Sequence, residues 1–257
     1  MAILLHTVQQ IDLWILHAFN VLSGNWVVDN AMDFISSNNL LKGALPVAAY
    51  WYLWFNRTAS QPRNRVILVQ GILAAFVAVI LARGLTHLLP VRMRPFVDPA
   101  SGSISFFEPN PKNFEDWSAF PSDTAAFTFA LSCTLMYISR RLGICLLLLS
   151  AIPACITRIY IGVHYPSDIV VGAMIGILAV WMMHKITISR LARSAVVQGT
   201  GNHPWFYCIA FVLTFEVAKV FSAIREARSF GIKLLHHLDP HSPDGASILS
   251  ALSPILV

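Results

Sequence analysis

Long apolar runs are the feature that most restricts how this chain can fold. A helix rises about 1.5 Å per residue, so roughly 20 residues are needed to cross the hydrocarbon core of a bilayer. Hydrophobic residues make up 56% of the 257 residues and charged residues only 12%, whereas about 25% of a typical soluble domain is charged. The composition therefore indicates an integral membrane protein with an all-α fold.

Six runs are expected to form a polytopic transmembrane helical bundle. Five long runs cover residues 66–89, 122–139, 143–162, 165–186 and 203–221, and a shorter one covers 41–56. Before them, residues 1–40 carry two short helical patterns interrupted by aspartate and asparagine, which predict short or interfacial helices. The basic start and small-residue cleavage site of a signal peptide are not found there.

Basic residues gather in three of the expected connections between spans. They are Arg57, Arg63 and Arg65, then Arg140 and Arg141, then Lys185, Arg190 and Arg193. One threading puts all three connections on the same side, which the positive-inside rule makes cytoplasmic. The loop 90–121 and the turn at residue 164 then lie on the extracytoplasmic side. This bias and an anion site account for most of the net charge of +5, so no nucleic-acid partner is expected.

The segment TRIYIGVHYPSDIVVG, residues 157–172, carries the clearest chemical pattern. His164 is followed four residues later by Asp168, a spacing at which a carboxylate in the first turn of a helix can orient an imidazole. Arg158 lies six residues before the histidine and offers a guanidinium fork for a phosphate. Together the three side chains predict phosphoryl chemistry at a membrane surface.

Two further polar clusters lie at the ends of the expected outer loop. HLLPVRMRP, residues 87–95, ends one span, and FPSDTA, residues 120–125, opens the next. A proline followed by Ser122 is typical of a helix start, where free backbone N–H groups attract an anion. Arg83 and Arg92 are interpreted as interface or loop residues rather than as ligands.

The three clusters resemble the signature of the type 2 phosphatidic acid phosphatase superfamily, which is K-x6-R-P, then P-S-G-H, then S-R-x5-H-x3-D. The matching positions are Arg94 and Pro95, Pro121 and Ser122, and Arg158, His164 and Asp168. The order of the motifs and the lengths between them also fit. The resemblance covers roughly residues 8–188, and residues 41–188 are expected to form the catalytic transmembrane core.

The resemblance implies a mechanism. His164 would attack phosphorus to form a phosphohistidine while Asp168 holds the other ring nitrogen. Positive side chains and helix-start N–H groups would stabilise the charge of the transition state. No metal or other cofactor is implied, and the spacing of the histidines in the C-terminal tail is too irregular to predict a metal site. The expected substrate-binding residues are Arg94, Ser122, Asp123, Thr124 and Arg158.

The chain departs from the family pattern at the position of the general acid and at two positions near it. Thr124 stands at the histidine of the second motif, Asp123 at its glycine, and His87 at the lysine of the first. In the family that histidine donates a proton to the leaving group, which a threonine hydroxyl cannot do near neutral pH. His87 is a candidate catalytic acid in its place. Asp123 is a weaker one, because adjacent helical positions point about 100° apart.

The missing acid favours a substrate with an easy leaving group. Loss of the acid should lower the rate by about two to four powers of ten on a phosphate monoester. The loss should be smaller on a diphosphate, whose leaving phosphate has a pKa of about 6. The leading hypothesis is therefore hydrolysis of a lipid diphosphate or phosphate, such as undecaprenyl diphosphate, in a bacterial inner membrane. A lipid-linked phosphotransferase with a non-water acceptor and a catalytically impaired lipid-phosphate binder are the alternatives.

The C-terminal part extends beyond the family pattern. Residues 189–202 form a basic linker, and residues 203–257 add one further span and an amphipathic tail. On the extracytoplasmic side the tail could act as a lid, mediate homo-oligomerisation or lie poorly ordered. The four cysteines all lie in apolar runs without C-x-x-C pairing and are interpreted as buried small residues.

Overall fold

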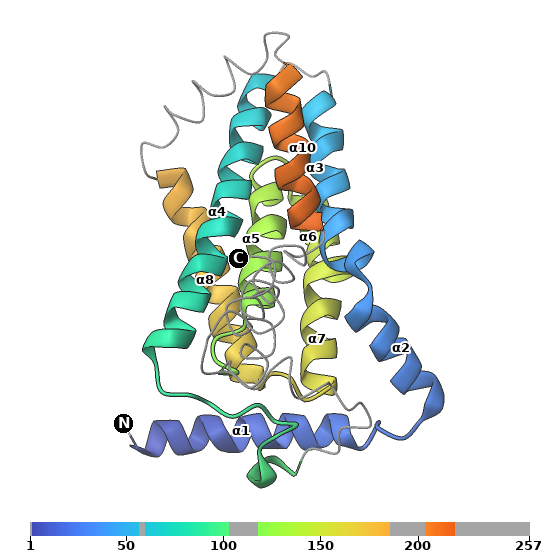
Figure 1. The fold of residues 1–257 in the computed structure, drawn as a ribbon, viewed down its shortest axis with the longest axis vertical. Helices are drawn as coiled ribbons and strands as arrows, with labels where there is room; N and C mark the ends of the chain where they lie inside the picture. Colours follow the sequence, from blue (N-terminus) through green and yellow to red (C-terminus); the bar gives the residue numbers. More distant parts are fainter. Residues whose placement is uncertain (1, 57–59, 103–117, 186–203, 219–257) are drawn as a thin grey trace, which may run out of the picture.

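The computed structural model of the chain describes residues 2–56, 60–102, 118–185 and 204–218. Every regular element in those ranges is a helix (Figure 1), which confirms the expected all-α fold. The expected basic linker and amphipathic tail, together with the tail histidines, lie outside the described residues.

In chain order, and with the labels of Figure 1, the helices of these ranges are α1 (Ala2–Asn20), α2 (Trp26–Ser37), η1 (Leu40–Ala44), α3 (Leu45–Phe55), α4 (Gln61–Leu88), η2 (Pro99–Ser101), α5 (Asp123–Met136), α6 (Arg140–Leu146), η4 (Leu147–Ala151), α7 (Ile152–Tyr160), α8 (Pro166–Lys185) and α10 (Pro204–Ala218).

Prolines and a short polar side chain set the helix ends that matter for the site. α4 ends at Leu88 because Leu89 precedes a proline, which disfavours helical backbone in the residue before it. Ser122 caps α5, and its hydroxyl oxygen accepts a hydrogen bond from the N–H of Ala125 at 3.4 Å. α8 begins at Pro166, where a residue without an N–H loses no helical hydrogen bond.

Three helical segments in the described part of the chain are long and apolar enough to cross a membrane. They are α4, the continuous run Arg140–Tyr160 formed by α6, η4 and α7, and α8. The other expected spans, 41–56, 122–139 and 203–221, contain the shorter helices α3, α5 and α10, of 11, 14 and 15 residues. The chain is thus a membrane protein with three candidate spans, and the count of six stays a prediction.

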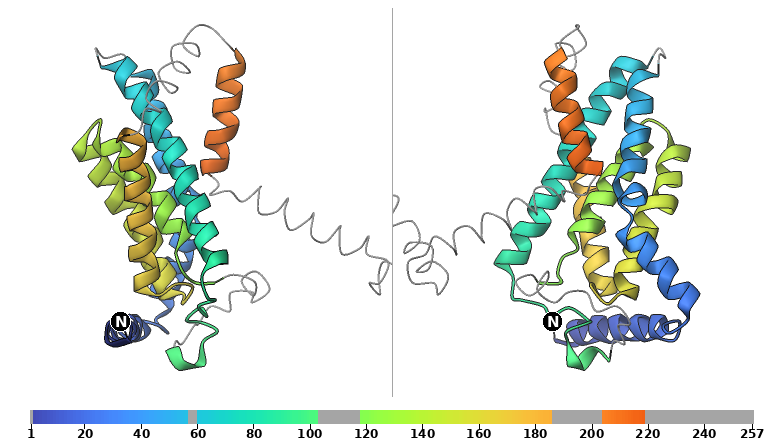
Figure 2. Two further views of the ribbon diagram at one scale, coloured as in Figure 1. Left: turned by 90° about the vertical axis from the view of Figure 1, so that its left-hand side faces the viewer. Right: turned by 45° about the vertical axis from the view of Figure 1, so that its right-hand side comes forward.

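The N-terminal helix α1 runs crosswise to the others. In Figure 1 it lies below the ends of α7 and α8, and both views in Figure 2 keep it outside the bundle at that end. It packs against α7 and α8. The side-chain amide of Asn20 also donates to the carbonyl oxygen of Gly102 at 3.0 Å. The sequence predicted a short or interfacial helix over residues 11–24, whereas α1 begins earlier, at Ala2, and ends at Asn20.

Helices α4, α5 and α8 form the centre of the bundle and make the most extensive contacts with one another. Small side chains allow the close approach, as is common where apolar helices pack inside a membrane. On α4 they recur every fourth residue at Ala74, Ala78 and Ala82, none of which is exposed to solvent. The core therefore depends on small residues on one face of each helix.

The approach of α8 to α5 is close enough to require glycine. A Cβ atom on Gly172 would lie 2.2 Å from the carbonyl oxygen of Ser122, and one on Gly176 would lie 2.3 Å from that of Ala126. Both neighbouring atoms belong to the backbone and cannot rotate away. Any side chain at these positions would push the start of α8 away from the start of α5.

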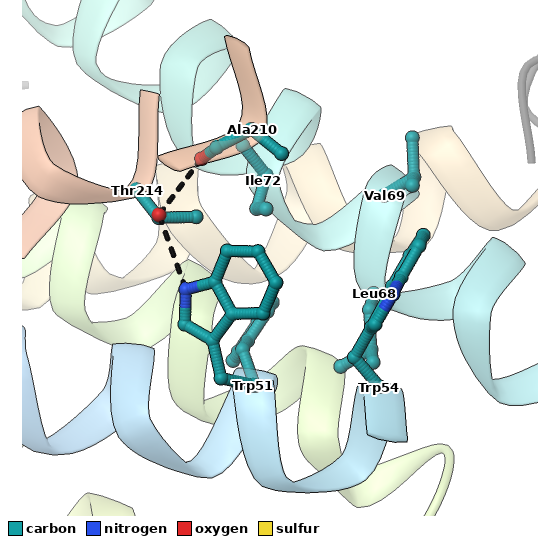
Figure 3. A pocket seen from close by; sticks show the side chains of 8 residues that line it. Trp51, Trp54, Leu68, Val69, Ile72, Ala210 and Thr214 are labelled. Atoms are coloured by element: carbon teal, nitrogen blue, oxygen red, sulfur yellow. Dashed lines mark hydrogen bonds between the residues drawn. The ribbon is translucent and has the colours of Figure 1, made fainter. Parts of the chain in front are cut away.

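A small apolar cavity lies at the opposite end of α4 from Leu88. Figure 3 shows its lining between α3, α4 and α10, with the indole N–H of Trp51 donating to the hydroxyl of Thr214 at 3.2 Å. Leu68 also lines this cavity, and the 20 residues from there to Leu88 span roughly 30 Å of helix. The cavity is therefore remote from the three motifs.

The cysteines differ from their expected burial. Cys155 is buried, Cys133 is half-buried, and Cys145 and Cys208 are exposed, all four as free thiols. The last two lie on outward faces of helices, so apolar surroundings in the sequence did not imply protein contacts.

We predict that Gly176→Ala destabilises the folded protein, because the new methyl group overlaps the backbone of α5. Overpacking of this kind costs about 1–3 kcal/mol, so the midpoint of thermal unfolding in detergent should fall on the order of 5 °C. Gly84→Ala is the control, because a Cβ atom there meets nothing within 4 Å. Equal midpoints for the two variants would contradict the close-packing argument.

Candidate active site

The three sequence motifs meet at one end of the bundle, between α1 and the ends of α4, α5, α7 and α8 (Figure 1). The guanidinium of Arg94 donates to the carbonyl oxygen of Val163 at 3.1 Å. The guanidinium of Arg158 donates to the hydroxyl of Thr124 at 3.1 Å. The backbone N–H of Ser122 donates to the carbonyl oxygen of Asp168 at 3.1 Å. Residues that are far apart in sequence are therefore bonded to one another as expected.

His164 lies in the turn between α7 and α8, and only 4% of its surface is exposed. Its Nδ1 atom is 2.7 Å from the carbonyl oxygen of Ala119. A carbonyl oxygen only accepts, so this contact requires the proton on Nδ1 and leaves the lone pair on Nε2. Burial lowers the pKa of His164, and the positive charges of Arg94 and Arg158 lower it further. The imidazole is therefore neutral at pH 7, as a nucleophile must be.

Asp168 does not make the direct hydrogen bond to His164 that the motif predicts. Its Oδ2 atom is 3.9 Å from Nδ1, which is beyond hydrogen-bond distance. The carboxylate instead accepts from the backbone N–H of Tyr165 at 2.8 Å and from a guanidinium nitrogen of Arg92 at 2.5 Å. It is fully buried. Asp168 thus lies near the imidazole without bonding to it. The backbone carbonyl oxygen of Ala119 is the atom that orients the ring.

Arg92 bridges two buried carboxylates, one on each side. Its Nη1 atom contacts Asp168, and its Nη2 atom donates to Asp12 of α1 at 2.7 Å. Burial alone would lower the pKa of Arg92, but the charges of Asp168 and Asp12 raise it above its ordinary value, so the guanidinium stays charged. Arg92 lies in the loop after α4, as interpreted from the sequence, and its ion pairs with Asp12 and Asp168 are contacts that the sequence did not predict.

Two other guanidinium groups, those of Arg94 and Arg158, lie close enough for their positive charges to interact. Burial lowers the pKa of Arg94 to about 10, and the nearby positive charge of Arg158 contributes to that decrease. The buried Nε–H of Arg158 has no hydrogen-bond acceptor in the described part of the chain. A phosphate would supply the negative charge and the acceptor oxygens that such a pair of arginines favours.

Ser122 lies at the start of α5 as predicted, and the contacts of the next two residues differ in kind. The hydroxyl oxygen of Ser122 caps the helix and its N–H is bonded to the backbone of α8, so its primary contacts are structural. Thr124 accepts from Arg158 and its hydroxyl is 3.4 Å from the Oδ1 atom of Asp123. Asp123 also forms an ion pair with Arg83 at 3.3 Å.

His87 lies near the end of α4 and is exposed, whereas Thr124 and His164 are buried. The role of His87 as a replacement acid stays a prediction.

Sequence reasoning missed Asp12 and the carbonyl of Ala119. Asp12 is the one Asp, Glu, Lys or Arg residue within α1, and an ionisable residue in an apolar helix often marks a functional contact. That signal was present in the sequence. Ala119 carried none, because it acts through a backbone atom that every residue possesses.

Residues 67–191 match the PAP2 superfamily, and the chain belongs to it. The match contains all three motifs but begins after α1, α2 and α3. This confirms the resemblance that the motifs indicated.

Three curated relatives share part of the chain. The lipid A 4'-phosphatase of Bacteroides thetaiotaomicron is 38% identical over 87 residues, which are 32% of this chain and 38% of the relative. The bacitracin transport permease protein BcrC of Bacillus licheniformis is 29% identical over 53% of this chain and 60% of the relative. The undecaprenyl-diphosphatase BcrC of Bacillus subtilis is 25% identical over 63% and 77%.

The chain thus spans less than two thirds of the length of the first two of these relatives. No solved structure matches it.

We predict that the imidazole of His164 stays neutral well below pH 6.5, its ordinary pKa. Because burial and two arginines lower the pKa, the ring keeps its lone pair as the pH falls toward about 5.5, where an ordinary histidine is mostly protonated. NMR of protein labelled at histidine, with the resonance assigned by its loss in His164→Asn, measures this directly. A midpoint at or above 6.5 in the substrate-free protein would contradict it.

Proposed function

We propose that this protein is a membrane phosphatase that cleaves a lipid diphosphate or phosphate through a phosphohistidine intermediate. The observation that carries the proposal is the neutral, buried His164 beside the two arginines of an anion site. Membership of the PAP2 superfamily supports it, as does the similarity to two relatives, a lipid A 4'-phosphatase and an undecaprenyl-diphosphatase.

In the first step the Nε2 lone pair of His164 attacks phosphorus. A P–N bond forms, the bond from phosphorus to the leaving oxygen breaks, and that oxygen keeps the electron pair. Arg94 and Arg158 bind the equatorial oxygens, where negative charge is greatest in the transition state. The Nδ1 proton stays on the ring and continues to donate to the carbonyl of Ala119.

In the second step a water molecule attacks the phosphohistidine. A P–O bond forms, the P–N bond breaks and its electron pair returns to Nε2. One proton of the attacking water passes to a phosphate oxygen or to bulk water. The product is inorganic phosphate, and His164 regains the neutral form in which it started.

The residue at the acid position favours a diphosphate. The hydroxyl of Thr124 accepts from Arg158 and lies 3.4 Å from Asp123, and a hydroxyl does not act as a general acid near neutral pH. A leaving phosphate needs little protonation because its pKa is about 6. A polyprenyl diphosphate such as undecaprenyl diphosphate fits this requirement, since its lipid tail would remain in the bilayer.

The expected location follows from the charge bias of the connections. We place the protein in a bacterial inner membrane with His164 on the extracytoplasmic face, because the basic connections favour the cytoplasm. The domain division, with residues 41–188 as the catalytic core, is part of the same proposal.

We predict that His164→Asn lowers phosphate release from undecaprenyl diphosphate by at least about three powers of ten, because it removes the nucleophile. Release of inorganic phosphate in detergent micelles is the assay. His184→Asn is a matched control, because His184 also bonds a backbone carbonyl through Nδ1 but lies near the far end of α8.

The same assay with a 32P-labelled substrate tests the intermediate, because a quenched reaction should retain acid-labile label on the wild type. Full activity of His164→Asn would contradict the proposal. Tight binding of every diphosphate without release would favour an impaired binder, and labelled acceptor in place of free phosphate would favour a phosphotransferase.

We predict that Thr124→His raises kcat/KM more for a lipid monophosphate than for the corresponding diphosphate. The new imidazole can protonate a poor leaving group, a gain of up to about two to four powers of ten, whereas a phosphate leaving group needs that proton less. Thr124→Asn is the control, because asparagine has similar size but no acidic proton. The explanation fails if both substrates gain equally or if asparagine produces the same gain.

A further inference from the structure

We infer that Asp12 of α1 is a positioning residue for the nucleophile, because it neutralises Arg92 and so leaves the negative charge of Asp168 available to His164. The inference rests on the proposed function for its consequence in catalysis. It concerns a residue outside the three motifs and outside the segment that matches the superfamily.

The contacts of Asp12 are those of a buried, fully paired carboxylate. Only 1% of its surface is exposed. One oxygen accepts from the backbone N–H of Ser167 at 2.8 Å. The other accepts from the Ser167 hydroxyl at 2.6 Å and from Nη2 of Arg92 at 2.7 Å. A buried charge is held in this way only when ionic and hydrogen-bonding partners compensate its desolvation.

The three side chains form a row that ends behind the imidazole. Asp12 contacts Arg92, Arg92 contacts Asp168, and Asp168 lies 3.9 Å from Nδ1 of His164. The guanidinium carbon of Arg92 also lies 4.2 Å from the ring centre of Tyr165, which holds its plane in place. The row thus runs from the N-terminal helix to the nucleophile through direct contacts.

The net charge of the row explains how Asp12 can act on the imidazole. Two carboxylates and one guanidinium carry a net charge of −1, whereas Arg92 and Asp168 without Asp12 carry none. When Nε2 of His164 bonds to phosphorus, the ring becomes cationic, and a net negative charge behind Nδ1 stabilises it. Asp12 is therefore the source of the charge that favours the reaction, although it does not touch the imidazole.

A purely structural role for Asp12 is separable, because α1 has other attachments at the same end. Nε2 of His17 is 3.1 Å from the carbonyl oxygen of Ser101, and Asn20 donates to Gly102. Asp12→Asn preserves the size of the side chain and an oxygen that can accept from Ser167. It removes the charge without removing the helix.

The test is the pKa of His164 in four proteins, measured by histidine NMR without substrate. The row carries −1 in the wild type, 0 in Asp12→Asn, −2 in Arg92→Gln and −1 in the double variant. The pKa should therefore fall in Asp12→Asn, rise in Arg92→Gln and return toward the wild-type value in the double variant. The other charges that face the imidazole, those of Arg94, Arg158 and Asp123, are the same in all four proteins.

Kinetics supply the second measurement. Asp12→Asn should lower kcat roughly 10-fold, the equivalent of one pKa unit at His164, with little change in KM. Arg92→Gln in the same protein should recover part of that loss. Asp29→Asn is the matched control, because Asp29 also accepts hydrogen bonds from another segment, at Tyr160 of α7, but has no place in the row. It should leave kcat unchanged.

Several results would overturn the inference. They are pKa changes of the same sign in both single variants, an unchanged pKa in Asp12→Asn, or a loss of kcat that Arg92→Gln deepens. If Asp12→Asn does not fold, the rise expected in Arg92→Gln still decides the question. The titration needs no substrate, so an inactive wild type would contradict the proposed function while leaving this result intact.

Discussion

The close approach of α5 and α8 is the constraint on which the rest of the site depends. With no side chain at Gly172, the carbonyl of Ser122 lies against α8 and the N–H of Ser122 reaches the carbonyl of Asp168. The first turns of the two helices are thereby fixed to each other. Thr124 lies in the first turn of α5 and His164 lies just before α8, so the positions of both residues are restricted. Backbone contacts thus set the geometry of the site on which its side chains depend.

Opposite charges act on His164. Arg94 and Arg158 hold positive charge near the imidazole, and the row of Asp12, Arg92 and Asp168 ends 3.9 Å from its Nδ1 atom. The arginines suppress protonation of the free imidazole, which keeps it nucleophilic. The anionic row favours the cationic ring, which forms when Nε2 bonds to phosphorus. Such an arrangement serves both states of the ring, because a bound phosphate cancels the charge of the arginines.

Local patterns in the sequence predicted much of this molecule. Apolar runs predicted helices, and three short motifs predicted which residues meet. The pattern did not predict where the helices in the runs 41–56 and 122–139 begin and end, because α3 and α5 are shorter than those runs. Nor could it predict the pairing of Asp12 with Arg92, because these residues are 80 positions apart and no periodicity links them. Ala119 acts through its backbone carbonyl, which a pattern of side-chain types cannot predict.

The crosswise helix α1 also has a consequence for biogenesis. Its carboxylate is matched by Ser167, which lies 155 residues later in the chain. At a synthesis rate of about 5–20 residues per second, roughly 10–30 s pass between the emergence of the two partners. The charge of Asp12 has no partner until Arg92 emerges, 80 residues after it, and its hydrogen bonds are incomplete until Ser167 follows. The membrane surface, where water can solvate Asp12, is where α1 can lie during that interval. The first segment to be made is thus among the last to reach its final contacts.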